Sequence, residues 1–171
     1  MSLGTKLIQA VQKEAAMKRP LPLQAIASDE LRGRGRVRAA VTLTDNDRFS
    51  HMASELKVAI DRSPTKQSNR AARNTGENAI DFVRRATYLT ESLQCVEANS
   101  GGDTVVRSTP ATMRGVRAPY FEAVVGKDEL SLRRYQPHTD RPGREDVPFC
   151  LTDEVMTRLV EDAAAVLAGK V

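Results

Sequence analysis

Apolar residues recur at the 3.6-residue spacing of an α-helix in four stretches of the chain. This pattern predicts helices at residues 4–18, 47–61, 76–90 and 153–167. The second predicted helix follows Thr44-Asp45-Asn46-Asp47, a run that suits a helix cap and an acidic first turn. The last has the most regular apolar stripe, and it runs from a Thr152-Asp-Glu start to a stop signal at Gly169.

Elsewhere the apolar residues alternate with polar ones, which is the pattern of a half-buried β-strand. The alternation predicts five strands: residues 36–44, 93–98, 104–109, 119–125 and 129–135. Turn sequences at residues 99–103 and at Gly126-Lys127 predict that the last four strands form two hairpins of one antiparallel meander. In the second hairpin, four apolar side chains should share one face: Phe121, Ala123, Leu130 and Leu132.

The predicted order of elements, α-β-α-α-β-β-β-β-α, indicates an α+β fold. We expect an antiparallel four- or five-stranded meander sheet with helices packed mainly on one face and a long helix at the C-terminus. Residues 1–33 are expected to form an N-terminal helix and a linker, and residues 34–171 a single α+β domain. With 171 residues, the chain can bury enough surface to fold without a disulfide or a metal.

Charge is distributed unevenly along the chain. The formal net charge is +4, with 26 basic and 22 acidic residues. Residues 1–86 hold 16 basic and nine acidic residues, whereas residues 87–171 hold 10 basic and 13 acidic residues. The N-terminal half is therefore the basic half, which favours an acidic protein, an anionic lipid or nucleic acid as a partner.

Four arginines begin the first predicted strand, in the run Arg32-Gly-Arg34-Gly-Arg36-Val-Arg38. On a strand, Arg34, Arg36 and Arg38 point to one face with their heads about 7 Å apart. A guanidinium group suits anions because its planar fork donates two hydrogen bonds at once. Alternatively, the charges protect an exposed sheet edge or are merely solvated. An edge position for this strand favours protection, whereas an interior position leaves the arginines available for binding.

A second basic segment follows the predicted helix at residues 47–61. Residues 62–74 lack apolar periodicity and contain no acid, so we interpret them as a basic surface loop. Beside the arginine row, this loop would complete a patch for an anion or nucleic acid through Lys66, Arg70 and Arg73. No aromatic residues are interleaved with these cations, so contacts would go to a phosphate backbone rather than to stacked bases.

A further group of arginines lies on the predicted hairpins and on the loop that connects them. Its members are Arg107, Arg114, Arg117, Arg133 and Arg134. One interpretation is a salt-bridged sheet surface, in which Glu97 and Glu122 are cross-strand partners. The other is a second site for a small anion.

Residues that signal catalysis or metal binding are sparse. His51 and His138 are the two histidines, and neither has a nucleophile or carboxylate at diagnostic spacing. Cys95 and Cys150 do not have metal-ligand spacing, so we predict no metal, no cofactor and no catalytic residue. No apolar run suits a signal peptide or membrane insertion, and the expected compartment is the cytoplasm, with both thiols reduced.

Together these patterns predict a non-enzymatic interaction domain that contacts an acidic protein partner through its basic N-terminal half. One alternative is a weakly sequence-specific binder of the nucleic-acid backbone. Another is an enzyme acting on an anionic small molecule, which a concave pocket holding arginines and a desolvated carboxylate would favour. The apolar stripe of the last predicted helix would also allow a homodimer.

Overall fold

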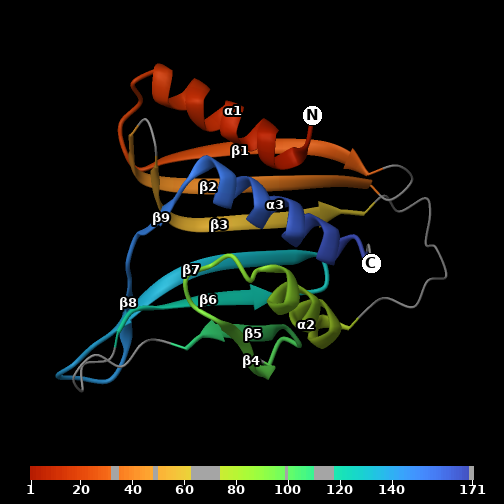
Figure 1. Cartoon of the computed structure of the whole chain (residues 1–171), viewed down its shortest axis with the longest axis vertical. Coiled ribbons are helices and arrows are strands. Elements are labelled where there is room, and N and C mark those ends of the chain that lie inside the picture. Colours follow the sequence, from red (N-terminus) through yellow and green to blue (C-terminus); the bar gives the residue numbers. More distant parts are fainter. Residues whose placement is uncertain (32–34, 48–49, 63–73, 99, 110–117, 170–171) are drawn as a thin grey trace.

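The computed structural model describes residues 1–31, 35–47, 50–62, 74–98, 100–109 and 118–169. These residues form nine strands and three helices (Figure 1). In chain order they are α1 (Leu3–Ala16), β1 (Leu23–Leu31), β2 (Gly35–Asn46), β3 (His51–Asp61), α2 (Thr75–Arg85), β4 (Leu93–Ala98), β5 (Thr104–Ser108), β6 (Tyr120–Val125), β7 (Glu129–Pro137), β8 (Arg144–Asp146), β9 (Phe149–Leu151) and α3 (Asp153–Leu167). The predicted α+β class, antiparallel sheet and C-terminal helix are confirmed, but the sheet has more strands than the four or five that were predicted.

All the strands belong to one antiparallel sheet with the order β1-β2-β3-β7-β6-β5-β4. The short strands β8 and β9 pair with β7 and β3, respectively. Two runs of consecutive strands, β1 to β3 and β4 to β7, are joined where β3 pairs with β7. β1 and β4 are therefore the outer strands of this order, and β2 is an interior strand.

The predicted helix at residues 47–61 is wrong, because residues 51–61 form the strand β3. The buried positions of β3 alternate, but the alternation shifts by one residue between Ala53 and Leu56, where the pairing with β2 is irregular. A bulge inserts one extra residue into a strand. The resulting three-residue step between buried positions resembles helical spacing, which explains the error.

Strands also form in two segments where the sequence predicted none. Residues 23–31, in the predicted N-terminal linker, form β1 and pair with β2 along their whole length. The alternation in β1 is inconspicuous because Ala25 and Ala27 supply two of its buried positions. β8 and β9 have three residues each, too few to show a period. The division of the chain into residues 1–33 and 34–171 stays a prediction.

The core lies between one face of the sheet and the three helices, which all lie in front of the sheet in Figure 1. The opposite face is called the helix-free face below. α1 packs against β1 and α3, and Gly4 permits the close approach of the two helices. A Cβ atom at Gly4 would lie 2.7 Å from the carbonyl oxygen of Thr157. Within the described residues, none of the helices has the length and apolar character needed to cross a membrane.

Candidate interaction surface

Arg36 and Arg38 lie on the interior strand β2 and point to the helix-free face. Their side chains are 57% and 54% exposed. Arg36 Nε donates to Glu30 Oε1 on β1 at 2.9 Å, and Arg38 Nη2 donates to Asp61 Oδ2 on β3 at 2.9 Å. The two guanidinium groups are therefore oriented by neighbouring strands but remain accessible. Arg34, the third member of the predicted row, lies outside the described residues.

One end of the sheet, which we call the arginine end, is marked by Arg36, Arg38 and Arg62. There β1 ends at Leu31 opposite Gly35, and the end of β3 lies opposite Arg36. The segments that follow β1 and β3 in the sequence, 32–34 and 63–73, lie outside the described residues. Arg62 pairs with Asp128 of the β6–β7 turn and donates to the carbonyl oxygen of Leu167 at 3.2 Å. Three predicted site residues in the second segment lie outside the described residues: Lys66, Arg70 and Arg73.

The basic excess of the chain falls entirely in segments outside the described residues. Those segments contain nine basic residues and no acidic residue: Arg32, Arg34, Arg48, Lys66, Arg70, Arg73, Arg114, Arg117 and Lys170. Because the whole chain has 26 basic and 22 acidic residues, the described part has 17 basic and 22 acidic residues. Seven of these nine cations fall in the segments 32–34, 63–73 and 110–117, whose arginines and lysine the sequence analysis had singled out; Arg48 and Lys170 are the other two.

Surface carboxylates accompany the arginines at this end of the sheet. A groove with a volume of about 360 Å³ lies beside the end of β3, and four of its lining residues are acidic: Asp61, Asp103, Asp128 and Glu129. Lys127 is the basic residue among the side chains that line it. The described surface of the arginine end therefore presents both signs of charge.

The second arginine group is centred on Glu122, which is only 6% exposed. Arg107 Nε donates to Glu122 Oε2 at 2.6 Å from the neighbouring strand β5. Arg144 on β8 forms a bidentate pair with the same carboxylate, at 2.6 and 2.9 Å. Burial by itself raises the pKa of Glu122, but the hydrogen bonds from Arg144 and Arg107 outweigh burial, and the pKa is lowered. Glu122 is thus held ionised, with both oxygens engaged.

Arg144 completes this network, and the sequence analysis missed it. Its guanidinium carbon lies 3.8 Å from the ring centroid of Tyr135, and its Nη1 donates to the hydroxyl oxygen of Tyr120 at 2.8 Å. The strand that carries Arg144 has only three residues, too few to show an alternation in the sequence. The pairing of β8 with β7 is what places Arg144 over Glu122.

The remaining predicted members of the group do not gather on one face. Arg133 points to the helix-free face and pairs with Glu55 at 3.1 Å and Asp146 at 3.3 Å. Arg134 points to the other face, where it pairs with Glu91 at 2.6 Å and its guanidinium carbon lies 4.4 Å from the ring centroid of Phe121. Arg114 and Arg117 lie outside the described residues. These ion pairs are those expected of a salt-bridged surface, and the small-anion site stays a prediction.

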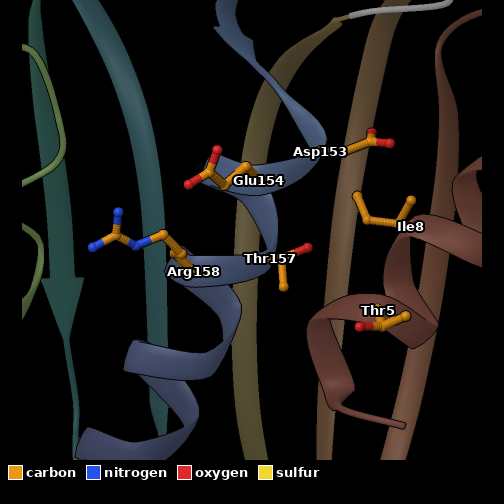
Figure 2. Close-up of a pocket in the computed structure, with 6 residues that line it drawn as sticks. All are labelled: Thr5, Ile8, Asp153, Glu154, Thr157 and Arg158. Atoms are coloured by element: carbon orange, nitrogen blue, oxygen red, sulfur yellow. The ribbon is translucent and has the colours of Figure 1, made fainter.

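His51 is buried at the start of β3 and connects the sheet to α3. Its Nε2 lies 2.6 Å from Asp153 Oδ1 in the first turn of α3, and its Nδ1 bonds to Asn46 Oδ1. Both ring nitrogens are therefore engaged in holding elements together. Asp153 also lines a shallow groove of about 380 Å³ between α1 and α3, whose other lining residues are Thr5, Ile8, Glu154, Thr157 and Arg158 (Figure 2).

Within the described residues there is no group of three or more His, Cys, Asp or Glu side chains placed to hold a metal ion. Comparison of the chain with models of protein families, with curated proteins and with solved structures finds no match.

Proposed function

We propose that this chain is a non-enzymatic interaction domain that contacts an acidic protein partner through the arginine end of its sheet. The observation that carries the proposal is the position of Arg36 and Arg38. They lie on an interior strand and face the side of the sheet that bears no helix. More than half of each side chain is exposed, so a partner's carboxylates have access to both guanidinium groups.

The interior position of β2 argues against a purely protective role for the arginines. Charges protect a sheet when they lie on a strand whose backbone groups are unpaired. β2 pairs with β1 on one side and β3 on the other, so it has no open edge to protect. Ion pairs with Glu30 and Asp61 orient the arginines, and exposed pairs of this kind contribute only about 0–1 kcal/mol each. Exchange of these carboxylates for those of a partner is therefore inexpensive.

Charges of both signs at this end favour a protein over nucleic acid. A polyanion that approached Arg36 and Arg38 would also meet Glu30 and Asp61, and like charges in contact are unfavourable. A protein surface can place carboxylates against the arginines and basic groups against the acidic groove. Charge complementarity of this kind accelerates association and fixes orientation. The segment that follows β3 in the sequence, residues 63–73, contains a further three cations.

Two of the described candidates for acid–base chemistry, Glu122 and His51, are occupied by structural contacts. Glu122 accepts hydrogen bonds from two arginines on both oxygens, and its pKa is lowered. A general acid or base requires a group that is free to exchange a proton with a substrate near neutral pH. Both nitrogens of His51 are engaged, as described above. This supports binding rather than turnover as the role of the domain.

The proposal is tested by titrating fluorescent Asp- and Glu-rich peptides, and in parallel mixed RNA and DNA oligonucleotides, across a salt series. We expect the peptides to bind, and the Arg36→Ala/Arg38→Ala variant to bind them about tenfold more weakly. Arg84→Ala, which removes an exposed cation from α2, is the matched control and should bind as the wild type does.

Two results would decide against the proposal. Binding of oligonucleotides alone, with log affinity falling linearly with log salt, would establish the nucleic-acid alternative. Peptide binding that is equal in the double variant and in Arg84→Ala would remove the arginine end from the interaction. A triple variant, Lys66→Ala/Arg70→Ala/Arg73→Ala, then tests the contribution of segment 63–73.

A further inference from the structure

The outer edge of β1 is a second surface with the properties of an interaction site. β1 has nine residues, and among the described strands it pairs only with β2. In Figure 1 it is the outermost strand at the top of the sheet, and α1 runs obliquely along it, close to the strand near the N label and above the strand toward the upper left. In an antiparallel pair, every second residue directs its backbone N–H and C=O groups away from the partner. Half of the backbone of β1 therefore faces outward.

The residues that face outward can be identified from one contact. The backbone N–H of Glu30 donates to Asp29 Oδ1 at 2.9 Å, so it does not point at β2. By alternation, the backbone groups of Gln24, Ile26 and Ser28 also face outward. Glu30 bounds this set on one side because its N–H is taken, and Pro22 bounds it on the other because proline has no N–H. The outward donors are thus three residues centred on Ile26.

The side chains of β1 do little to discourage pairing. Native sheets usually protect an open edge with lysine, proline, a bulge or a short strand. The segment Leu23–Ser28 has no charge, no proline and no register shift. β4, the outer strand at the other side, has six residues and an irregularity between Cys95 and Glu97.

Exposed apolar side chains also occur in β1 and in the connection before it. Six large apolar side chains are exposed among the described residues, and three of them lie in β1 or in the connection that leads into it. These three are Met17, Leu21 and Ile26, with exposures of 48%, 47% and 52%. Ile26 is therefore an exposed apolar side chain in the middle of the open edge, where a second strand would cover part of it.

We propose that two copies of this chain form a dimer by antiparallel pairing of their β1 strands about a two-fold axis at Ile26. This register is self-complementary. Gln24 lies opposite Ser28 of the second copy, and Ile26 lies opposite Ile26 of the second copy, so every outward donor finds an acceptor. Pro22, which lacks an N–H, lies opposite Glu30, whose N–H is already taken. On the helix side, Ala25 lies opposite Ala27, and both side chains are small.

The charges beside β1 favour a second copy over an unrelated strand. Asp29 and Glu30 place two carboxylates at the C-terminal end of β1, whereas Lys18 and Arg19 place two cations just before its N-terminal end. Antiparallel pairing brings the acidic end of one strand toward the basic end of the other. Parallel pairing would instead bring like charges together. The Arg19 side chain pairs with Glu14 at 3.0 Å within its own copy but is 58% exposed, so the second copy has access to it.

The dimer is tested with the full chain by light scattering after size exclusion and by amide hydrogen exchange, both over a wide range of protein concentration. We expect a mass that rises from monomer to dimer with concentration. The amides of Gln24, Ile26 and Ser28 should exchange more slowly at high than at low concentration. A monomer at every soluble concentration would overturn the proposal.

Two substitutions locate the interface. Ser28→Pro removes an outward donor without breaking a bond to β2, and by symmetry the dimer loses two hydrogen bonds, so its dissociation constant should rise about tenfold or more. Ile26→Lys places like charges at the two-fold axis and should have a similar effect. Val96→Lys, at an exposed position on β4, is the control and should leave the dimer intact.

The remaining outcomes are equally decisive. Should Ser28→Pro not fold, Ile26→Lys alone decides, because its side chain lies on the surface. A dimer that persists in folded Ile26→Lys would overturn the proposal. The proposal would also be overturned if the wild type is monomeric and binds a synthetic peptide of residues 21–31, and if the Ser28→Pro variant does not bind this peptide. The edge of β1 would then bind extended peptides rather than a second copy.

Discussion

Replacement of Glu122 by glutamine tests whether the arginine network on the helix-free face stabilises the fold. The substitution keeps the size and shape of the side chain but removes its charge. In the wild type, Glu122 accepts hydrogen bonds from Arg107 Nε and from both terminal nitrogens of Arg144. The amide NH₂ of glutamine donates and does not accept, so one half of the new side chain would face guanidinium donors.

The expected loss follows from the number of bonds and the exposure of the partners. A hydrogen bond to a charged group contributes about 1.5–3 kcal/mol, and Glu122 is 6% exposed. The Arg107 and Arg144 side chains are 33% and 34% exposed, so water recovers part of their lost interactions. Glutamine also retains one acceptor. We therefore expect Glu122→Gln to lower the free energy of unfolding by about 2–3 kcal/mol.

The measurement is urea unfolding followed by circular dichroism, since the chain has no tryptophan. Glu97→Gln is the control, because Glu97 is 60% exposed and lies 3.6 Å from the same Arg107, and it should cost less than about 0.5 kcal/mol. A double-mutant cycle with Arg144→Met should give a coupling energy of about 1–2 kcal/mol. Equal losses for Glu122→Gln and Glu97→Gln would refute the reasoning.

Three further predictions use the same unfolding assay. The pKa of Glu122 is lowered in the folded state, so the stabilisation by its ionised carboxylate is fully present above the ordinary glutamate pKa of about 4.3. This stabilisation is lost as the pH falls through the lower folded pKa. The free energies of unfolding of the wild type and of Glu122→Gln should therefore converge in acid. Gly4→Ala should cost about 1–3 kcal/mol, since its Cβ would lie 2.7 Å from the Thr157 oxygen; unchanged stability would contradict this packing. Phe82→Ala should lower the free energy of unfolding by about 3–5 kcal/mol, because Phe82 is fully buried. Ile80 is 47% exposed on the same helix, so Ile80→Ala should lower it by less than about 1 kcal/mol. Equal losses would contradict the difference in burial between the two side chains.

Elements with strong local signals were predictable from the sequence. α3 spans residues 153–167 as predicted, because its cap and its apolar stripe lie close together in the chain. The Thr152 side chain accepts from the N–H of Val155, which confirms the expected start of this helix. Likewise, Gly126 marks the turn between β6 and β7, and its N–H donates to the carbonyl oxygen of Glu129. Both features depend on residues within one turn of each other.

Features that depend on the order of strands were not predictable. The irregular pairing between β2 and β3 shifted the buried positions of β3 and produced a helix-like spacing. The partner of Arg38 is Asp61, 23 residues away, and β3 had to be a strand for the two to meet. Arg144 reaches Glu122 across 22 residues through β8. In each case the missing information was which strands lie side by side, and local spacing does not contain it.

The two proposals combine into one geometry while remaining separable. A two-fold axis at Ile26, perpendicular to the sheet, keeps the helix-free faces of both copies on the same side and points their arginine ends in opposite directions. Arg36 lies opposite Glu30, four residues beyond Ile26, so the Arg36 positions of the two copies lie about 30 Å apart. Such a dimer is bivalent, and a partner with two acidic segments at that separation gains affinity without any new contact. Ser28→Pro leaves both arginines in place, so it removes the gain in affinity from bivalent binding but not binding at a single arginine end. Arg36→Ala/Arg38→Ala instead weakens binding at each arginine end and leaves the dimer intact.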